Sequence, residues 1–265
     1  MKDFGIFLFG HTRDKYLNAV LESLRLQDAL DYVEIWLDGH QGNPVLKNEC
    51  EKVYQTVKQY EVSRILRHNG HLNFRKLIIH ALESSIDRYR NILVLEDDCF
   101  PTSNAVAVFR EQLEFIESSP EVFSVYGHPF LVEDEGEYIG RFQGWGWGTN
   151  TIKLSMILPR LKECFMMDEA KYLKFVEQSL TDDIVDAIDC TKGREATRTL
   201  KRFFSWDETL ALLTAMEGMK HKKTPIRTIY NFGAGDNSGH FKNVAWYRKP
   251  PFNMISIEEV WDYFD

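Results

Sequence analysis

The chain has 265 residues, of which 44% are hydrophobic and 27% charged, and this balance is typical of a globular protein with a sizeable core. A formal net charge of −8 argues against a general affinity for nucleic acid, which is itself polyanionic. Four cysteines lie far apart without a CxxC pair, which favours a reducing compartment over a disulfide framework, and no apolar run approaches the roughly 18 to 20 residues of a membrane helix.

The first part of the chain alternates short apolar strands with amphipathic helices. The predicted strands are residues 4–9, 33–37, 63–66 and 92–95. The predicted helices, in which apolar residues recur at helical spacing, are one that begins after Thr12 as its N-cap, then residues 46–60 and 73–86. Strands joined through helices imply right-handed crossovers and a mixed, mostly parallel sheet flanked by helices, so the predicted fold class is α/β.

Three carboxylates, Glu96, Asp97 and Asp98, directly follow the fourth predicted strand. A strand buried on both faces has no reason of its own to end in three negative charges, and ligands bind outside the carboxyl ends of strands in an open α/β sheet. Hard carboxylate oxygens suit Mn²⁺ or Mg²⁺, which can bridge to a substrate phosphate. The alternative is a solvated acidic turn, but the apolar strand before it favours a metal or ligand site.

Polar residues also follow the first two predicted strands, at Arg13 and Asp38. Each has an ordinary explanation, since Arg13 can be a surface charge and Asp38 a turn residue before Gly39. The carboxyl ends of the strands in a doubly wound sheet converge on one edge, so we expect Arg13, Asp38 and the three carboxylates to lie together. A cation, a base-pairing carboxylate and a metal site at one edge would suit a nucleotide diphosphate.

The middle of the chain contains an unusual glycine and tryptophan alternation. A helix is predicted from Pro101 to residue 118 and a strand at 122–126, and the segment RFQGWGWGTN then carries Trp145 and Trp147 between glycines. A period of two would place both indoles on one side, as stacking surfaces for a sugar, and bare backbone on the other. The alternative, that both tryptophans belong to the core, is equally compatible with the pattern.

Residues 156–204 look helical and contain no recognisable site, so we interpret them as a helical insertion. The next helix opens at Ser205, and Glu208 lies at capping-box spacing from it. Asp207 between them is either a carboxylate that complements the helix dipole or a general base. A helix N-terminus lowers a carboxylate pKa and weakens the base, whereas partial burial beside Trp206 acts in the opposite direction, so both interpretations stay open.

A glycine-rich loop, residues 233–240, follows a strand predicted at 226–231. It lacks the GK[ST] ending of a P-loop. Such a loop can fold over phosphates with its backbone N–H groups and Ser238, while His240 can reach a metal, although a lone loop histidine is more often only solvated. The aromatic tail that begins at Phe241 is expected to pack on the site or on another subunit.

With these features in order, the chain resembles the GT-A glycosyltransferases, and more closely the N-acetylglucosaminyltransferase I-like group and bacterial glycosyltransferases related to family 2. The motifs that carry the resemblance are LEDD with the following FP, WD at the start of a helix, and RTIYNFGAGDNSGHF at its spacing from WD. The match covers most of the chain except the helical stretch before Phe203 and the tail.

The resemblance implies a metal-dependent glycosyltransferase that moves a sugar from a nucleotide-diphospho-sugar, with a UDP-sugar favoured, to a hydroxyl of a glycan or lipid-linked acceptor. Asp207 would deprotonate that hydroxyl, and a single base opposite the leaving group implies inversion at the anomeric carbon. The family's second carboxylate after WD is Glu208 here, which the capping box also uses.

The donor-binding roles that the resemblance implies fall on the carboxyl ends of the strands. Arg13 would contact the diphosphate and Asp38 the base. Glu96 and Asp97 would contact ribose and sugar, and Asp98 would hold Mn²⁺ (or Mg²⁺) against the diphosphate. The loop 233–241 would close after donor binding, with Ser238 or His240 near the phosphates.

Two other functions compete with this one. A sugar-phosphate nucleotidyltransferase shares the sheet and the acidic site, but it would need a glycine-rich basic signature that GHTRDK does not match. A non-catalytic nucleotide-sugar or glycan-binding protein could use the same scaffold. We expect a single catalytic domain, residues 1–265, with a nucleotide-binding half (1–118) and an acceptor-binding half (119–265), a cytoplasmic location compatible with peripheral association at a membrane, and no nucleic-acid partner.

Overall fold

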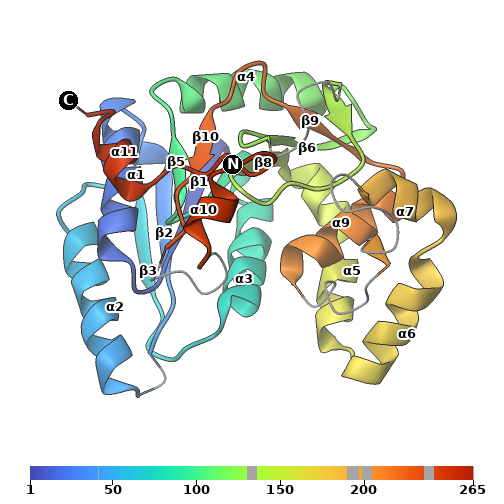
Figure 1. Ribbon diagram of the computed structural model, residues 1–265, viewed down its shortest axis with the longest axis horizontal. Helices are drawn as coiled ribbons and strands as arrows, with labels where there is room; N and C mark the ends of the chain where they lie inside the picture. Colours follow the sequence, from blue (N-terminus) through green and yellow to red (C-terminus); the bar gives the residue numbers. More distant parts are fainter. Residues whose placement is uncertain (41, 130–135, 190–196, 199–204, 236–241, 265) are drawn as a thin grey trace.

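The computed structural model describes residues 1–265 except 41, 130–135, 190–196, 199–204, 236–241 and 265. A central sheet is its main feature (Figure 1). The strands of this sheet are, in spatial order, β3 (Arg64–Arg67), β2 (Val33–Leu37), β1 (Lys2–Gly10), β4 (Tyr89–Glu96), β8 (Trp147–Asn150), β6 (Val122–Tyr126), β9 (Lys220–Lys223) and β7 (Tyr138–Ile139).

The sheet is mixed and mostly parallel, as predicted. Strands β3, β2, β1 and β4 are parallel neighbours, β8 is antiparallel to both β4 and β6, β9 is parallel to β6, and β7 is antiparallel to β9. The register places Gly10 opposite Leu37 and Phe9 opposite Glu96. Strands β1, β2 and β4 therefore end level with one another, and the residues that follow them meet at one edge.

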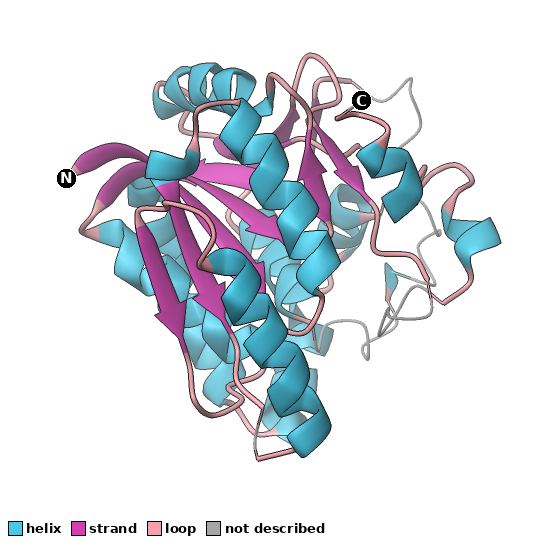
Figure 2. Cartoon of the chain, turned by 90° about the vertical axis from the view of Figure 1, so that its left-hand side faces the viewer, coloured by secondary structure: helices cyan, strands magenta, loops and turns pink. Residues whose placement is uncertain are grey.

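Helices cover both faces of the sheet (Figure 2). One core contains inward side chains of α1 (Asp14–Leu26), α2 (Pro44–Val57) and α4 (Ala105–Glu117), with β1 residues such as Ile6 and Leu8. The other core contains side chains of α3 (Phe74–Ile86) and α9 (Trp206–Met216), with Phe7 and Phe9. Alternate residues of β1 thus enter opposite cores, which explains why its sequence is a continuous apolar run.

The segment 156–204, predicted to be helical, contains helices in its described part, namely α5 (Thr151–Met166), which begins five residues earlier than predicted, α6 (Glu169–Ser179) and α7 (Asp182–Ile188). These helices pack beside α9 at the right of Figure 1 and share a core with it. The first predicted helix begins at Asp14 with Arg13 as N-cap, so the assignment of Thr12 as N-cap is wrong by one residue.

The C-terminal segment returns to the first half of the molecule through α10 (Val244–Tyr247) and α11 (Ile257–Trp261). The Ile255 amide donates to the Asn231 carbonyl at 3.1 Å, and Phe264 packs edge-on against Phe100. Two short strands, β5 (Cys99–Pro101) and β10 (Ile229–Asn231), pair antiparallel in a second small sheet. This small sheet joins the segment after Asp98 to the start of the glycine-rich loop.

Among the helices of the described residues, none combines the length and the apolar character that crossing a bilayer requires.

Candidate active site at the carboxyl edge of the sheet

The structure brings the acidic residues after β4 into contact with Arg13. The Arg13 guanidinium donates to both carboxylate oxygens of Asp97, at 3.3 Å from Nε to Oδ2 and more closely from Nη2 to Oδ1. The same Nη2 lies 3.0 Å from Oδ2 of Asp98. Asp97 and Asp98 are buried, whereas Glu96 is partly exposed. The predicted convergence of the ends of β1 and β4 is therefore present.

Negative charge in this cluster exceeds what Arg13 offsets. Although the Glu96 residue is partly exposed, burial of its carboxyl group raises the pKa well above the ordinary carboxyl range, and the nearby charges of Asp98 and Asp97 raise it further. Burial also raises the pKa of Asp97, even though the contact with Arg13 acts in the opposite direction. A bound cation would stabilise the ionised form of these carboxylates. The cluster at the edge of the sheet is therefore a candidate cation site.

Asp98 is held by the small sheet. Its backbone carbonyl accepts from the Phe232 amide at 3.0 Å, and its Oδ1 lies 3.5 Å from Nδ2 of Asn231. A Cβ added to Gly233 would come within 2.2 Å of Oδ2 of Asp98. The first glycine of the glycine-rich loop therefore leaves the space into which this carboxylate points.

Replacement of Gly233 by alanine is expected to lower the free energy of unfolding by roughly 1–3 kcal/mol, because the added methyl group must displace Asp98 from its buried position. Urea unfolding measures this change. Gly136→Ala is the matched control, since a Cβ there meets open space. Equal stability of the two variants would contradict the close approach of Gly233 to Asp98.

Asp207 lies in the first turn of α9, near enough to the acidic cluster for its charge to act on Glu96. The Ser205 hydroxyl accepts from the Glu208 amide at 3.4 Å, as an N-cap does. The Glu208 carboxylate, however, pairs with the buried Arg141 at 2.5 Å. The capping spacing thus predicts the Ser205 bond correctly, while the Glu208 side chain anchors the helix through Arg141.

The electrostatics of Asp207 favour the general-base interpretation. Burial raises the pKa of this carboxyl, and the charge of Glu208 adds to the effect, while the Ser205 hydroxyl and Arg141 partly oppose it. Asp207 in turn raises the pKa of Glu96. Its Cβ lies 3.4 Å from the position of a Cβ added to Gly144, which is partly exposed. Asp207 is therefore electrostatically coupled to the acidic cluster, and Gly144 lies beside it.

Trp145 and Trp147 lie in different surroundings. Trp147 is fully buried in β8, where it stacks on Phe123 at a ring-centroid distance of 6.3 Å, so its interpretation as a sugar-stacking surface is wrong. Trp145 is partly exposed and packs against His128 and against the core that contains α1, α2 and α4. The period of two fails because Gly146 has a φ of +70° and turns the chain between them. Trp145 alone stays a candidate sugar contact.

Asp38, at the end of β2, is buried and bound to the loop that follows β3. Its Oδ1 accepts from the amides of Gly39 at 2.9 Å and Leu72 at 2.7 Å, and its Oδ2 lies 2.7 Å from Nδ1 of His71. Asp38 is thus at the predicted edge, with the 68–73 loop attached to it. Its role as a base contact stays a prediction.

Sequence reasoning missed His11 and His71, which lie beside Asp38 with their rings stacked 5.4 Å apart. A histidine directly after the first strand and HNGH after the third are the signals that could have indicated them. Ser238 and His240, the predicted phosphate and metal contacts of the glycine-rich loop, lie outside the described residues.

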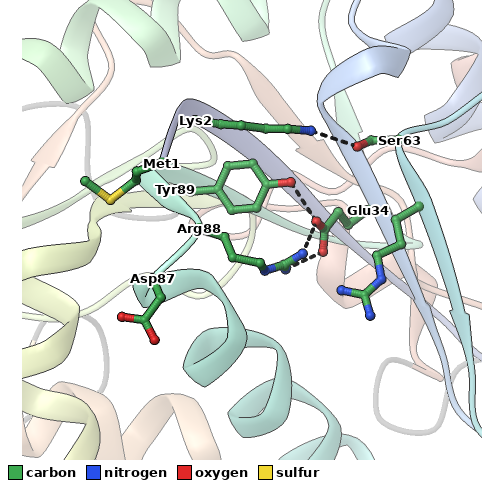
Figure 3. A pocket seen from close by; sticks show the side chains of 8 residues that line it. Met1, Lys2, Glu34, Ser63, Asp87, Arg88 and Tyr89 are labelled. Atoms are coloured by element: carbon green, nitrogen blue, oxygen red, sulfur yellow. Dashed lines mark hydrogen bonds and ion pairs between the residues drawn. The ribbon is translucent and has the colours of Figure 1, made fainter.

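A pocket of about 530 Å³ lies at the opposite edge of the sheet, at the amino ends of the strands (Figure 3). The buried Glu34 carboxylate there accepts from both terminal nitrogens of Arg88 and from the Tyr89 hydroxyl, each at 2.6 Å. Burial and this bond raise the pKa of Tyr89 to about 12. Because this carboxylate is already paired, the chemistry of the protein is better placed at the carboxyl edge.

No protein-family model and no curated protein sequence matches the chain. Solved structures with some similarity include 4-diphosphocytidyl-2C-methyl-D-erythritol synthase from Anaerococcus prevotii, with 9% identity and a TM-score of 0.44 over 66% of this chain and 84% of that one. Mannose-1-phosphate geranyltransferase from Thermus thermophilus has 13% identity and a TM-score of 0.43, over 84% and 74% of the chains.

A third similar structure is glucosyl-3-phosphoglycerate synthase from Mycobacterium tuberculosis, in complex with Mn²⁺, uridine diphosphate and phosphoglyceric acid. It has 7% identity and a TM-score of 0.37, over 57% of this chain and 56% of that one. With every TM-score below 0.5, these similarities do not assign the chain to a family.

Proposed function

We propose that this chain is a metal-dependent glycosyltransferase that transfers a sugar from a nucleotide-diphospho-sugar, with a UDP-sugar favoured, to a hydroxyl of a glycan or lipid-linked acceptor. The observation that carries the proposal is the combination of an acidic cluster with raised carboxyl pKa values at the end of β4 and a fourth carboxylate, Asp207, whose charge acts on Glu96. The acidic cluster suits a cation that binds a diphosphate, and Asp207 suits a general base.

The residues present fit a divalent cation. Asp98 would hold Mn²⁺ or Mg²⁺, because its carboxylate is confined beside Gly233 and its oxygens are the hard ligands that these ions prefer. When bound, the ion supplies neutralisation of the charge that develops on the leaving diphosphate. Glu96 and Asp97, next to it, are proposed to hold ribose and sugar hydroxyls.

Arg13 is proposed to exchange partners when the donor binds. Its guanidinium pairs with Asp97 and Asp98, and it is only partly buried, with 20% of the side chain exposed. A fork of N–H donors matches a phosphate as well as it matches a carboxylate. Arg13 would therefore turn toward the diphosphate while the cation takes over the neutralisation of the carboxylates.

Asp207 is proposed as the general base. It accepts the proton of the acceptor hydroxyl as that oxygen attacks the anomeric carbon and the bond to the diphosphate breaks. A pKa raised above that of an ordinary aspartate makes the carboxylate a stronger base than a solvated one. One base facing the leaving group gives inversion at the anomeric carbon, which NMR of the product measures; retention would contradict it.

The pH profile of kcat/KM should show this base. Asp207 acts only when it is deprotonated, and its pKa is raised, so activity is expected to fall on acidification at a pH above the value of about 3.9 that an ordinary aspartate gives. Values of kcat/KM measured between pH 4 and pH 8 locate this fall in activity. An activity that stays constant down to about pH 4 would contradict the assignment.

Donor hydrolysis tests the proposed function without knowledge of the acceptor. We expect a slow, Mn²⁺-dependent release of nucleoside diphosphate from one of a set of nucleotide-diphospho-sugars, with UDP-sugars first. Release of pyrophosphate from a nucleoside triphosphate and a sugar phosphate would instead identify a nucleotidyltransferase. Nucleotide binding without either reaction, when candidate acceptors are present, would identify a binding protein.

A further inference from the structure

Histidines are concentrated beside the ends of the first three strands. Five of the eight histidines of the chain lie in the segments after β1, β2 and β3 and in the following helix, namely His11, His40, His68, His71 and His80. The proposed function uses none of these five. A ring nitrogen of His11, a ring nitrogen of His71 and a carboxylate oxygen of Asp38 all lie within 4.8 Å of one another.

The carboxylate in this group is fixed in orientation. Two backbone amides, those of Gly39 and Leu72, hold Oδ1 of Asp38, and they leave Oδ2 directed at Nδ1 of His71 at 2.7 Å. The side chain of Asp38 is only 5% exposed. A carboxylate oriented by outer hydrogen bonds on one oxygen, with the other facing an imidazole nitrogen, is compatible with a metal site.

The first histidine is also oriented by the backbone. Nε2 of His11 lies 3.0 Å from the Gly39 carbonyl oxygen. An Nε2–H that donates to this carbonyl leaves Nδ1 with the lone pair that a metal ligand needs. The rings of His11 and His71 stack at 5.4 Å, and both side chains are partly exposed, so an ion held between them would be open to solvent on one side.

We propose that His11, Asp38 and His71 form a second metal site, separate from the acidic cluster, that binds a divalent transition-metal ion of the Zn²⁺ class. Imidazole ligands favour Zn²⁺ and its neighbours, whereas carboxylate oxygens alone favour Mn²⁺ and Mg²⁺. Three protein ligands with an open fourth position form the pattern of a zinc site that still binds water or another ligand. The ion would fasten the 68–73 loop to the ends of β1 and β2.

Binding requires the side chains to adjust, because any ligand atoms near the 4.8 Å limit must approach by about 1.5 Å while the closest pair must separate. Ligand atoms at roughly 2.0–2.1 Å from a tetrahedral ion are about 3.3 Å apart. Nδ1 of His71 and Oδ2 of Asp38 are 2.7 Å apart, so the His71 ring must withdraw by about half an ångström. The ring belongs to a partly exposed loop residue, which allows this shift.

Equilibrium dialysis against Zn²⁺, together with the visible spectrum of the Co²⁺-substituted protein, tests the site. The Asp98→Asn variant is used as background, so that an ion in the acidic cluster does not contribute. We expect one equivalent of Zn²⁺, a higher melting temperature with Zn²⁺ than with EDTA, and an intense tetrahedral Co²⁺ spectrum.

In that background, His71→Gln and His11→Gln are each expected to weaken Zn²⁺ binding at least about 100-fold, whereas His80→Gln, an exposed histidine of α3, leaves it unchanged. These histidines are partly exposed, so their variants should fold, which circular dichroism verifies. Absence of bound Zn²⁺ at micromolar free metal, or Zn²⁺ binding that survives both substitutions, would overturn the site. Either result leaves the proposed transferase reaction intact, since that reaction depends on Asp98 and Asp207.

Discussion

Exchange of Asp207 for asparagine is expected to lower the rate of Mn²⁺-dependent donor turnover roughly 10²–10⁴-fold, the contribution of one positioned general base. The amide keeps the shape of the side chain but cannot accept a proton. Because Asp207 raises the pKa of Glu96, its removal relieves repulsion in the site, so the melting temperature should stay equal or rise. Initial rates of nucleoside diphosphate release at saturating donor measure the loss.

Two comparisons separate catalysis from folding for Asp207→Asn. Donor affinity, measured by calorimetry, should change little, because the proposed base contacts the acceptor and not the donor. Asp183→Asn, an exposed aspartate in the first turn of α7, is the matched control and should keep full activity. A folded Asp207→Asn variant that retains more than about a tenth of the rate would remove the base from the mechanism.

Exchange of Asp98 for asparagine is expected to abolish the dependence of the reaction on Mn²⁺. The substitution keeps the volume of a buried side chain but removes the charge that would bind the ion. If the ion stabilises the developing diphosphate by several kcal/mol, the rate should fall about 10³-fold, since each 1.4 kcal/mol is a factor of ten. Titration of Mn²⁺ at fixed donor concentration measures both the rate and the apparent metal affinity.

The result for Asp98→Asn can be interpreted only if this variant is folded. The one side-chain oxygen of asparagine can accept from Nδ2 of Asn231 or from Arg13, but not from both. The backbone bond from Phe232 is unaffected, and loss of the Asp98 charge relieves repulsion with Glu96. We therefore expect cooperative unfolding close to that of the unmodified chain. An Asp98→Asn variant whose Mn²⁺ titration superimposes on that of the unmodified chain would place the metal elsewhere.

The first half of the fold is predictable from the sequence because three of its strands, β1, β2 and β4, are buried on both faces over most of their length. Continuous apolar runs and helical spacing predict β1 to β4 and α1 to α3 with boundaries within a few residues. The parallel register then follows, and with it the meeting of Arg13 with Asp97 and Asp98. That part of the site depends on local pattern and on a general property of such sheets.

The strand β9 could not be predicted, because its sequence, KHKK, has no apolar alternation. His221 and Lys222 are nevertheless buried. His221 lies 2.7 Å from the Ser124 hydroxyl, and Lys222 pairs with Glu137 at 2.5 Å. Partners about a hundred residues away satisfy these polar groups, and no local pattern contains that information.

The two tryptophans show the same limit at a smaller scale. Alternation predicts a shared face only if the backbone is extended throughout, and the positive φ of Gly146 breaks it. The Asp38 and His71 pair is another non-local contact, formed when the loop after β3 folds onto the end of β2. A lone histidine in a loop has no sequence pattern that would distinguish this pairing from solvation.

Anomalous diffraction at the manganese absorption edge, from crystals grown with Mn²⁺ and a nucleoside diphosphate, locates the cation at the site directly. We expect a peak bonded to the Asp98 carboxylate and to phosphate oxygens, with Arg13 turned away from Asp97 toward the diphosphate. A map without density beside Asp98, or with Asp97 and Asp98 still paired to Arg13 and the nucleotide bound elsewhere, would contradict the proposed mechanism.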